Sequence, residues 1–217
     1  MEGRTVLLIR HGAVDLPAVG TGIPRNYGPH EPLSDRGIHQ GILLAEQMKH
    51  QGIQPQLIIS SLYTRAYQTA DLLHKALPDH PPVIPDEKFN GARTPQWDHR
   101  PQSELGSVGG NYFADNPYLP DVHGETLPSA YTRVISEYKR ILDSHKTETI
   151  AIVTHGEIIG MIMHYLTVGE YGAPGVDQTV DKGEALVLRV SSEGKLLDTR
   201  HIISAEGSIP HVERRGG

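Results

Sequence analysis

The chain has 217 residues, 37% of them hydrophobic, which is enough for one substantial core, and its formal charge of −6 argues against a general nucleic-acid binder. The absence of cysteine excludes disulfides, thiolate catalysis and sulfur-ligated zinc. No apolar stretch is long enough for a membrane span or a signal peptide. We therefore expect a cytoplasmic protein with one domain over residues 1–217 and no membrane or nucleic-acid partner, and the sequence leaves the oligomeric state open.

Apolar runs alternate with segments of helical periodicity along most of the chain. In chain order, the pattern predicts a strand at 5–9, a helix at 34–50, a strand at 57–59, a helix at 63–77, a short strand at 83–84, a helix at 127–142, a strand at 149–153, a helix at 157–166 and a hairpin of strands at 185–190 and 196–203. This order predicts a three-layer α/β/α sandwich with a mostly parallel central sheet. The apolar face of the first helix is expected to carry Ile38, Ile42, Leu43 and Ala45.

Three segments lack this periodicity. A Pro- and Gly-rich loop runs from about residue 12 to 33, and loops of this length usually carry function or disorder. Residues from about 90 to 124 collect Gly, Pro and aromatic side chains, and we interpret them as an inserted cap. The end of the chain, about 205–217, is expected to be a polar tail.

Chemically active side chains follow three of the expected strands. Arg10 and His11 come after the first strand, Ser60 and Arg65 after the second, and His155 after the strand at 149–153. Ligands of open α/β sheets bind beyond the carboxyl ends of the strands, so parallel neighbours would bring these residues into one crevice. Arginine offers a planar fork of donors for phosphate, and a neutral imidazole is a nucleophile. The pattern therefore predicts a site for a phosphate ester.

The surrounding motifs resemble the histidine phosphatase superfamily, in its phosphoglycerate mutase-like branch. The matching stretches are Leu8–Gly12, Leu33–Gly37 with Gln40, Ser60–Ala70 and Val153–Gly156. They occur in the family's order and span about three quarters of the chain. The resemblance implies the family's fold and phosphohistidine chemistry.

By this resemblance, His11 is the nucleophile that carries the phosphoryl group. A phosphoryl group in transfer spreads negative charge over its equatorial oxygens, so Arg10, Arg65 and a protonated or donating His155 would stabilise that charge where it develops. These groups make a metal ion unnecessary, and we expect neither a metal nor another cofactor. A backbone acceptor on the second ring nitrogen of His11 would fix the tautomer that attacks.

A carboxyl group must protonate the leaving alcohol and later activate water. Glu87 is the candidate, because Glu87–Gly91 resembles the family's Glu-x-x-x-Gly stretch. Asp86 is its rival if the register slips by one residue. Glu125 resembles another family position, before a helix that here carries Arg133, and we expect it to organise the pocket.

The chain departs from the family pattern just after the first motif. Family members usually have a small polar or acidic residue there and an asparagine soon after, whereas this chain has Ala13–Pro17. Asn26, later in the same loop, is our candidate for the missing phosphate contact. The Ser-Ser-Pro-Leu stretch of the family is replaced by Ser60–Tyr63 here. The mutase-type signature of the first loop is missing, and its absence makes a mutase a less favoured interpretation than a phosphatase.

The expected cap supplies further candidates. Trp97 and Tyr112, with Phe113 and Tyr118, would either line a pocket for the leaving group, together with Ser60 and Glu125, or form the small core of the cap. The alternation of Asp121, His123 and Glu125 is compatible with a metal site, but solvated polarity is the better interpretation for such a loop. We therefore expect no metal.

These observations favour a phosphoric monoester hydrolase that acts on a small phosphorylated metabolite. The alternatives are an isomerase of the phosphoglycerate mutase type, a phosphoprotein phosphatase, and a regulatory module on an inactive scaffold. The complete set of motifs disfavours the inactive module.

Overall fold

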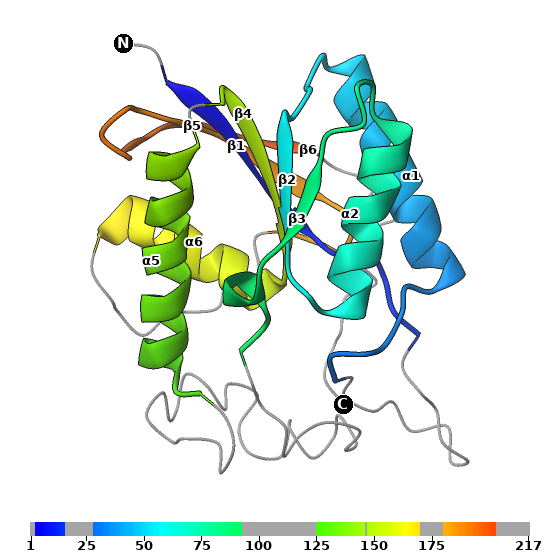
Figure 1. Ribbon diagram of the computed structural model, residues 1–217, viewed down its shortest axis with the longest axis horizontal. Helices are drawn as coiled ribbons and strands as arrows, with labels where there is room; N and C mark the ends of the chain where they lie inside the picture. Colours follow the sequence, from blue (N-terminus) through cyan, green and yellow to red (C-terminus); the bar gives the residue numbers. More distant parts are fainter. Residues whose placement is uncertain (1–2, 16–27, 93–124, 146, 170–179, 203–217) are drawn as a thin grey trace, which may run out of the picture.

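A computed structural model describes residues 3–15, 28–92, 125–145, 147–169 and 180–202. In these parts, one six-stranded sheet carries helices on both faces (Figure 1). The strands are β1 (Arg4–Arg10), β2 (Leu57–Ser60), β3 (Val83–Pro85), β4 (Thr149–Thr154), β5 (Ala185–Val190) and β6 (Leu196–Ile202). The helices are α1 (Asp35–His50), α2 (Thr64–Ala76), the 3-10 helix η1 (Glu87–Phe89), α5 (Leu127–Ser144) and α6 (Gly156–Val168). The predicted order of elements and the three-layer α/β/α fold are both confirmed.

The sheet has the strand order β3-β2-β4-β1-β5-β6. Strands β1 to β4 are parallel, while β5 and β6 form an antiparallel hairpin at one edge. The register pairs Arg10 with Thr154 and Ser60 with Val153, so β1, β2 and β4 end at the same level. The residues that follow these strands therefore meet at one edge of the sheet.

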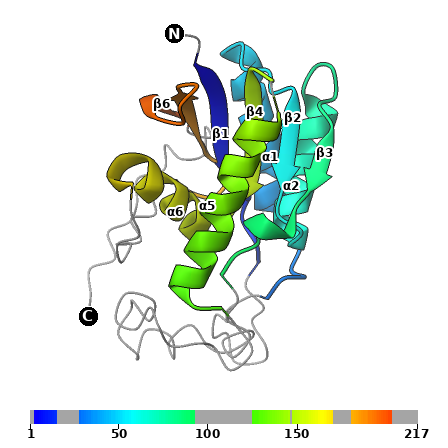
Figure 2. The same cartoon turned by 60° about the vertical axis from the view of Figure 1, so that its left-hand side comes forward.

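The two faces of the sheet bury separate apolar clusters. On β1, Val6 and Leu8 face the helices α5 and α6, whereas Leu7 and Ile9 face α1 and α2. Figure 2 shows the two pairs of helices on opposite sides of the central strands. A strand that is covered on both faces needs a continuous apolar run, which explains the sequence of β1 and β4.

The buried face of α1 differs from the one that periodicity predicted. Ile38 and Ile42 are 41% and 40% exposed, so their assignment to the apolar face was wrong. The helix instead turns two glycines inward, and a Cβ on Gly41 would lie 2.8 Å from Leu72 Cδ1 in α2. Small residues let α1 approach its neighbours closely, and this close approach decides which side of the helix is buried. The spacing of apolar residues along the sequence does not predict it. The inward side carries Gly37, Gln40, Gly41, Leu44, Ala45 and Met48.

The ends of the first loop are held together by Ser34, the N-cap of α1. The Ser34 amide donates to the Ala13 carbonyl at 3.0 Å, its hydroxyl donates to the same oxygen at 3.2 Å, and the hydroxyl accepts from the Gly37 amide. Gly12 faces Gly37 across this junction. The turn that carries His11 is thereby fixed to the N-terminus of α1.

Several sequence expectations concern residues outside the described parts. The polar tail lies there, and so does the inserted cap apart from residues 90–92. Within the described parts, no helix is long and apolar enough to cross a membrane. The cytoplasmic location stays a prediction.

We predict that Gly37→Ala lowers the free energy of unfolding by about 2 kcal/mol, because overpacking a tight contact costs roughly 1–3 kcal/mol. The new Cβ would lie 2.1 Å from the Ala13 carbonyl oxygen, which is backbone and cannot swing away. Urea denaturation measures the change. Gly160→Ala in α6 is the matched control, since its Cβ would meet nothing within 4 Å and should be neutral or stabilising. A G37A protein as stable as G160A would contradict the close contact.

Candidate active site

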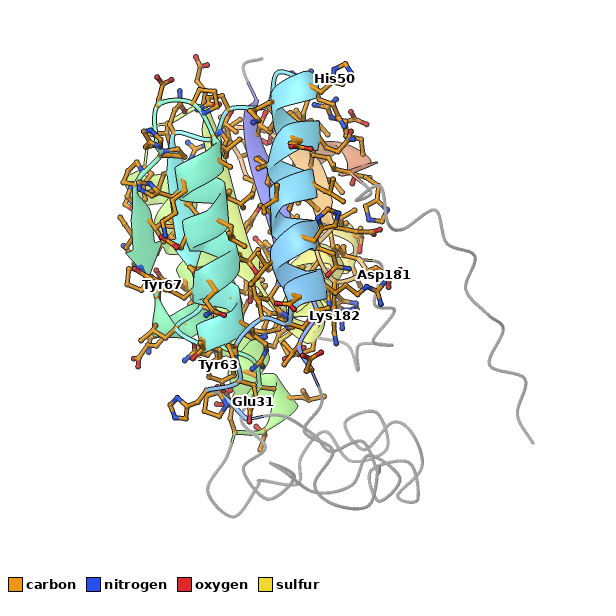
Figure 3. All side chains as sticks on the ribbon, turned by 90° about the vertical axis from the view of Figure 1, so that its right-hand side faces the viewer. Glu31, His50, Tyr63, Tyr67, Asp181 and Lys182 are labelled. Carbon is orange, nitrogen blue, oxygen red and sulfur yellow. The ribbon has the colours of Figure 1, made fainter. Side chains whose placement is uncertain are left out.

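The carboxyl ends of β1, β2 and β4 bring two histidines and two arginines together. His11 and His155 directly follow β1 and β4, and their ring centroids are 5.1 Å apart. Arg65 reaches both rings from the first turn of α2. Figure 3 shows that Glu31, Tyr63 and Lys182 lie at this end of the molecule, whereas His50 lies at the other. The convergence expected from the strand ends is present.

His11 is buried and held in one tautomer. Its Nδ1 lies 2.8 Å from the Gly12 carbonyl oxygen, and its Nε2 lies 3.2 Å from Nε of Arg65. Because a guanidinium group only donates, Nε2 must accept, and Nδ1 must carry the proton that Gly12 receives. The lone pair of Nε2 therefore points into the site. Burial, followed by the Arg65 cation, lowers the pKa of His11 well below its usual range, so the ring is neutral.

His155 is oriented by a short polar network. Its Nε2 lies 2.9 Å from Oγ of Ser61, and Ser61 in turn donates to Oδ1 of Asn90 at 2.9 Å. Since the single proton of the Ser61 hydroxyl is given to Asn90, His155 donates from Nε2 and accepts from Arg65 at Nδ1, over 3.4 Å. Burial, followed by the neighbouring His11 and Arg65, lowers the pKa of His155 well below its usual range. His155 is thus neutral, and its single ring proton is donated to Ser61.

Arg65 is the buried cation between the two rings. Its third described contact is a donation from Nη1 to the Gly28 carbonyl at 2.6 Å, and its Cζ lies 5.1 Å from the centroid of the Tyr63 ring. Only 4% of the residue is exposed. A buried guanidinium strongly favours an incoming anion, because the low local dielectric strengthens the attraction.

Arg10 supplies a second cation from the end of β1. Its Nη1 donates to the Val180 carbonyl at 3.0 Å, and its guanidinium packs on Gly156, where a Cβ would lie 3.2 Å from Cζ. The amide of Gly183 lies 3.2 Å from the carbonyl oxygens of both Arg10 and His11. The segment at 180–183 therefore supports the turn that carries both residues.

The two carboxylate candidates after β3 have different surroundings. The side chain of Glu87 is 71% exposed and its nearest described partner is Nζ of Lys88, at 3.7 Å. Asp86 instead caps η1 by accepting from the Lys88 amide at 2.8 Å. Burial, with a contribution from the neighbouring Glu137, raises the pKa of Asp86. Asp86 has a structural task, whereas Glu87 is free to turn toward a ligand.

Glu125 braces the segment that follows η1. It forms a two-point ion pair with Arg133, with Nε to Oε1 at 2.7 Å, and both side chains are mostly buried. Arg133 also donates to the carbonyl oxygens of Lys88 and Asn90, at 2.6 and 3.3 Å. Since Asn90 accepts from Ser61, this ion pair reaches the histidines through one chain of contacts.

The family of the chain follows from comparison with known proteins. The family model described as histidine phosphatase superfamily (branch 1) matches residues 6–200. The chain belongs to this superfamily. The expected enzyme class, a phosphoric monoester hydrolase, is confirmed with it.

A curated relative and solved structures agree with this assignment. The chain is 27% identical over 219 residues to a metal-independent phosphoserine phosphatase of Arabidopsis thaliana, covering 98% of this chain and 87% of the relative. A mycobacterial glucosyl-3-phosphoglycerate phosphatase superposes with a TM-score of 0.69 at 19% identity, over 93% of this chain and 98% of its own. The α-ribazole phosphatase of Shigella flexneri gives 0.70 at 22% identity, over 89% and 94%. These histidine phosphatase neighbours establish the fold.

The remaining sequence candidates fall in two groups. Ser60 is fully buried and donates to the Ser61 carbonyl, so it is Ser61 that contacts His155. Asn26, Trp97 and Tyr112 lie outside the described residues, as do Asp121 and His123. The structure thus gives no test of the first-loop and cap candidates.

Sequence reasoning missed several residues of this histidine phosphatase site. Asn90 stands inside the Glu-x-x-x-Gly stretch, directly before its glycine, and this motif was the signal that could have found it. Thr69 accepts from the Gly12 amide at 3.1 Å, and Gln40 accepts from the Ala13 amide at 2.8 Å. Glu157, which follows His155 by two residues, was also missed.

We predict that the two site histidines make the protein less stable in mild acid. Below pH 6.5 the rings are protonated in the unfolded chain but not in the folded protein. The free energy of unfolding therefore decreases as the pH is lowered through that window. The limiting slope is about 1.4 kcal/mol per pH unit for each histidine. Urea denaturation between pH 8 and 5 should show the fall.

His155→Asn is expected to remove part of this slope, and His50→Asn, at the exposed end of α1, should leave it unchanged. Equal slopes in the wild type and the H155N protein would contradict a buried neutral His155.

Proposed function

We propose that this histidine phosphatase hydrolyses a small phosphomonoester through a covalent phosphohistidine on His11, without a metal ion. The observation that carries the proposal is the lone pair of His11 Nε2, which faces Arg65 beside the ring of His155. A nucleophile and preorganised donors within one buried site are what in-line phosphoryl transfer requires.

The first step forms the N–P bond. Nε2 of His11 attacks phosphorus, the P–O bond to the alcohol breaks, and the alcohol leaves with a proton from Glu87. The charge on the phosphoryl oxygens is stabilised by Arg10 and Arg65, and by a hydrogen bond from Nδ1 of His155 once the bound dianion has favoured its protonated form. Gly12 accepts from Nδ1 of His11 throughout, so the positive charge that the phosphorylated ring gains is partly offset.

The second step releases phosphate. The Glu87 carboxylate takes a proton from water, the hydroxide attacks phosphorus, and the N–P bond breaks to return neutral His11. One carboxyl group thus acts as acid and then as base. The exposed position of Glu87 and its single long described contact to Lys88 support this role, because the side chain can turn toward the site at little cost.

Substrate binding must also free the nucleophile. In the site as described, Arg65 donates to the lone pair of His11. A phosphate dianion is a stronger acceptor than an imidazole, so the guanidinium fork would move its donors to the phosphoryl oxygens. The bound dianion would also raise the pKa of His155 toward its usual range.

The relatives support hydrolysis of a small substrate. The Arabidopsis relative is described as a metal-independent phosphoserine phosphatase, and the mycobacterial and Shigella neighbours as phosphatases of glucosyl-3-phosphoglycerate and α-ribazole phosphate. We propose the same class of substrate here, a small phosphorylated metabolite. Conversion of 3-phosphoglycerate to 2-phosphoglycerate at a rate above its hydrolysis would establish the mutase alternative instead.

We predict that His11→Ala lowers the turnover of an aryl phosphate by more than about 10³-fold, because the nucleophile is lost. The wild type should keep its activity in chelator. Rapid quenching should trap a phosphoenzyme that is labile in acid and stable in base. His50→Ala is the matched control and should retain full turnover. Activity that disappears in chelator and returns with one metal ion would reject the mechanism.

We predict that Glu87→Gln separates the two steps. With p-nitrophenyl phosphate, whose leaving group needs no proton, the E87Q protein should give a rapid burst and then accumulate phosphoenzyme. With an alkyl phosphate, formation of the phosphoenzyme should itself slow, by about 10²-fold or more. Asp86→Asn is the control. A burst in D86N rather than in E87Q would make Asp86 the acid and base.

A further inference from the structure

A carboxylate with no assigned task lies beside the phosphate-binding residues. Glu157 is the second residue of α6 and stands two positions after His155. A Cβ on Gly91 would lie 2.8 Å from Oε1 of Glu157, 3.4 Å from Cγ of His155 and 3.4 Å from Cε2 of Tyr63. Side chains from two separate segments, the start of α6 and the residue before α2, therefore meet over Gly91 at the edge of the site.

The placement of Glu157 is more than a helix-end effect. An acidic residue in the first turn of a helix is favoured by the helix dipole wherever the helix lies. That preference does not require the carboxylate to fold back over Gly91 toward His155. Among the described residues, no hydrogen bond or ion pair engages this carboxylate, which is half-buried. An anion is therefore held next to a site that binds another anion.

The charges of the bound phosphate and of the Glu157 carboxylate determine which alcohol group can lie between them. A phosphate dianion held by Arg10 and Arg65 and the Glu157 carboxylate repel each other at short range. A substrate that carries a positive group on its alcohol part removes this repulsion and gains a charge-assisted hydrogen bond to Glu157. A substrate with a second anionic group at the same place is disfavoured. The Tyr63 ring beside the carboxylate offers the apolar wall that the carbon chain of such an alcohol needs.

We infer that Glu157 is a specificity-determining residue that selects phosphomonoesters of amino alcohols, by accepting a hydrogen bond from the substrate ammonium group. The inference rests on the proposed phosphatase function, because it uses the same phosphate site. It adds a recognition element on the alcohol side of the ester. Glu157 takes no part in proton transfer to the leaving group, which remains the task of Glu87.

The test uses two esters that differ in one group. O-phosphoethanolamine carries an ammonium where 2-hydroxyethyl phosphate carries a hydroxyl, and the two are otherwise alike in length. The wild-type protein should prefer the amine by about tenfold or more in kcat/KM, as expected for one charge-assisted hydrogen bond. In Glu157→Gln, the ratio of the two kcat/KM values should fall toward one, and in Glu157→Lys it should invert.

Two controls separate specificity from folding and from general charge effects. Glu193→Gln, in the turn between β5 and β6, removes the same charge from a side chain that is 73% exposed, and it should leave the ratio unchanged. Glu157→Asp keeps the charge on a shorter arm and should retain part of the preference. Thermal unfolding of each variant shows whether it is folded.

Binding measurements keep this inference separate from the proposed reaction. The H11A protein cannot turn over the esters, so calorimetry measures its preference for the amine directly. One outcome would reject the proposed function and retain the inference: the H11A protein binds the amine better, the H11A/E157Q protein does not, and the wild type hydrolyses neither ester. Hydrolysis of both esters at equal kcat/KM in the wild type would overturn the inference and retain the function. An equal loss of both activities in E157Q would also overturn it, because Glu157 would then be the proton donor.

Discussion

The buried guanidinium of Arg65 is the interaction on which the site depends. It donates to both histidines and to a backbone carbonyl, so each ring nitrogen near it has a defined role. Burial, together with this cation, keeps the rings neutral, and the neutral rings in turn give the cation acceptors that carry no charge. An incoming phosphate is a stronger acceptor than these neutral groups and can take over the guanidinium donors. The affinity of the site for phosphate therefore comes from a cation that is already buried and oriented by its contacts.

Much of the fold could be predicted because its signals are local. The apolar runs of β1, β2 and β4 mark strands that are covered on both faces, and the polar residues after them mark the carboxyl edge of the sheet. His11, Arg65 and His155 were found in this way, and the family motifs supplied their roles. Alternation of strands and helices was sufficient for the three layers. The short strand β3 and the edge hairpin also followed from composition and turn residues.

The missed features depend on contacts between distant segments. Ile38 and Ile42 fit a helical stripe, yet α1 turns glycines inward, because close approach to the Gly12 turn and to α2 outweighs the burial of two side chains. Ser61 was passed over in favour of Ser60, since one residue of register decides which hydroxyl points to His155. The position of Glu157 over Gly91 arises only after folding. Spacing along the chain carries no information of this kind.

The clamp between Ala13 and Ser34 has a consequence for how this enzyme can change. Two hydrogen bonds to one carbonyl oxygen close the intervening chain at its base, while the nucleophile stands outside it. The entropy of closing a loop grows only slowly with its length. A change of length between Ala13 and Ser34 that spares the Gly28 contact to Arg65 should therefore have little effect on the geometry of His11. Changes in this loop can therefore alter which substrates are accepted while the position of the nucleophile, and with it the reaction, is kept.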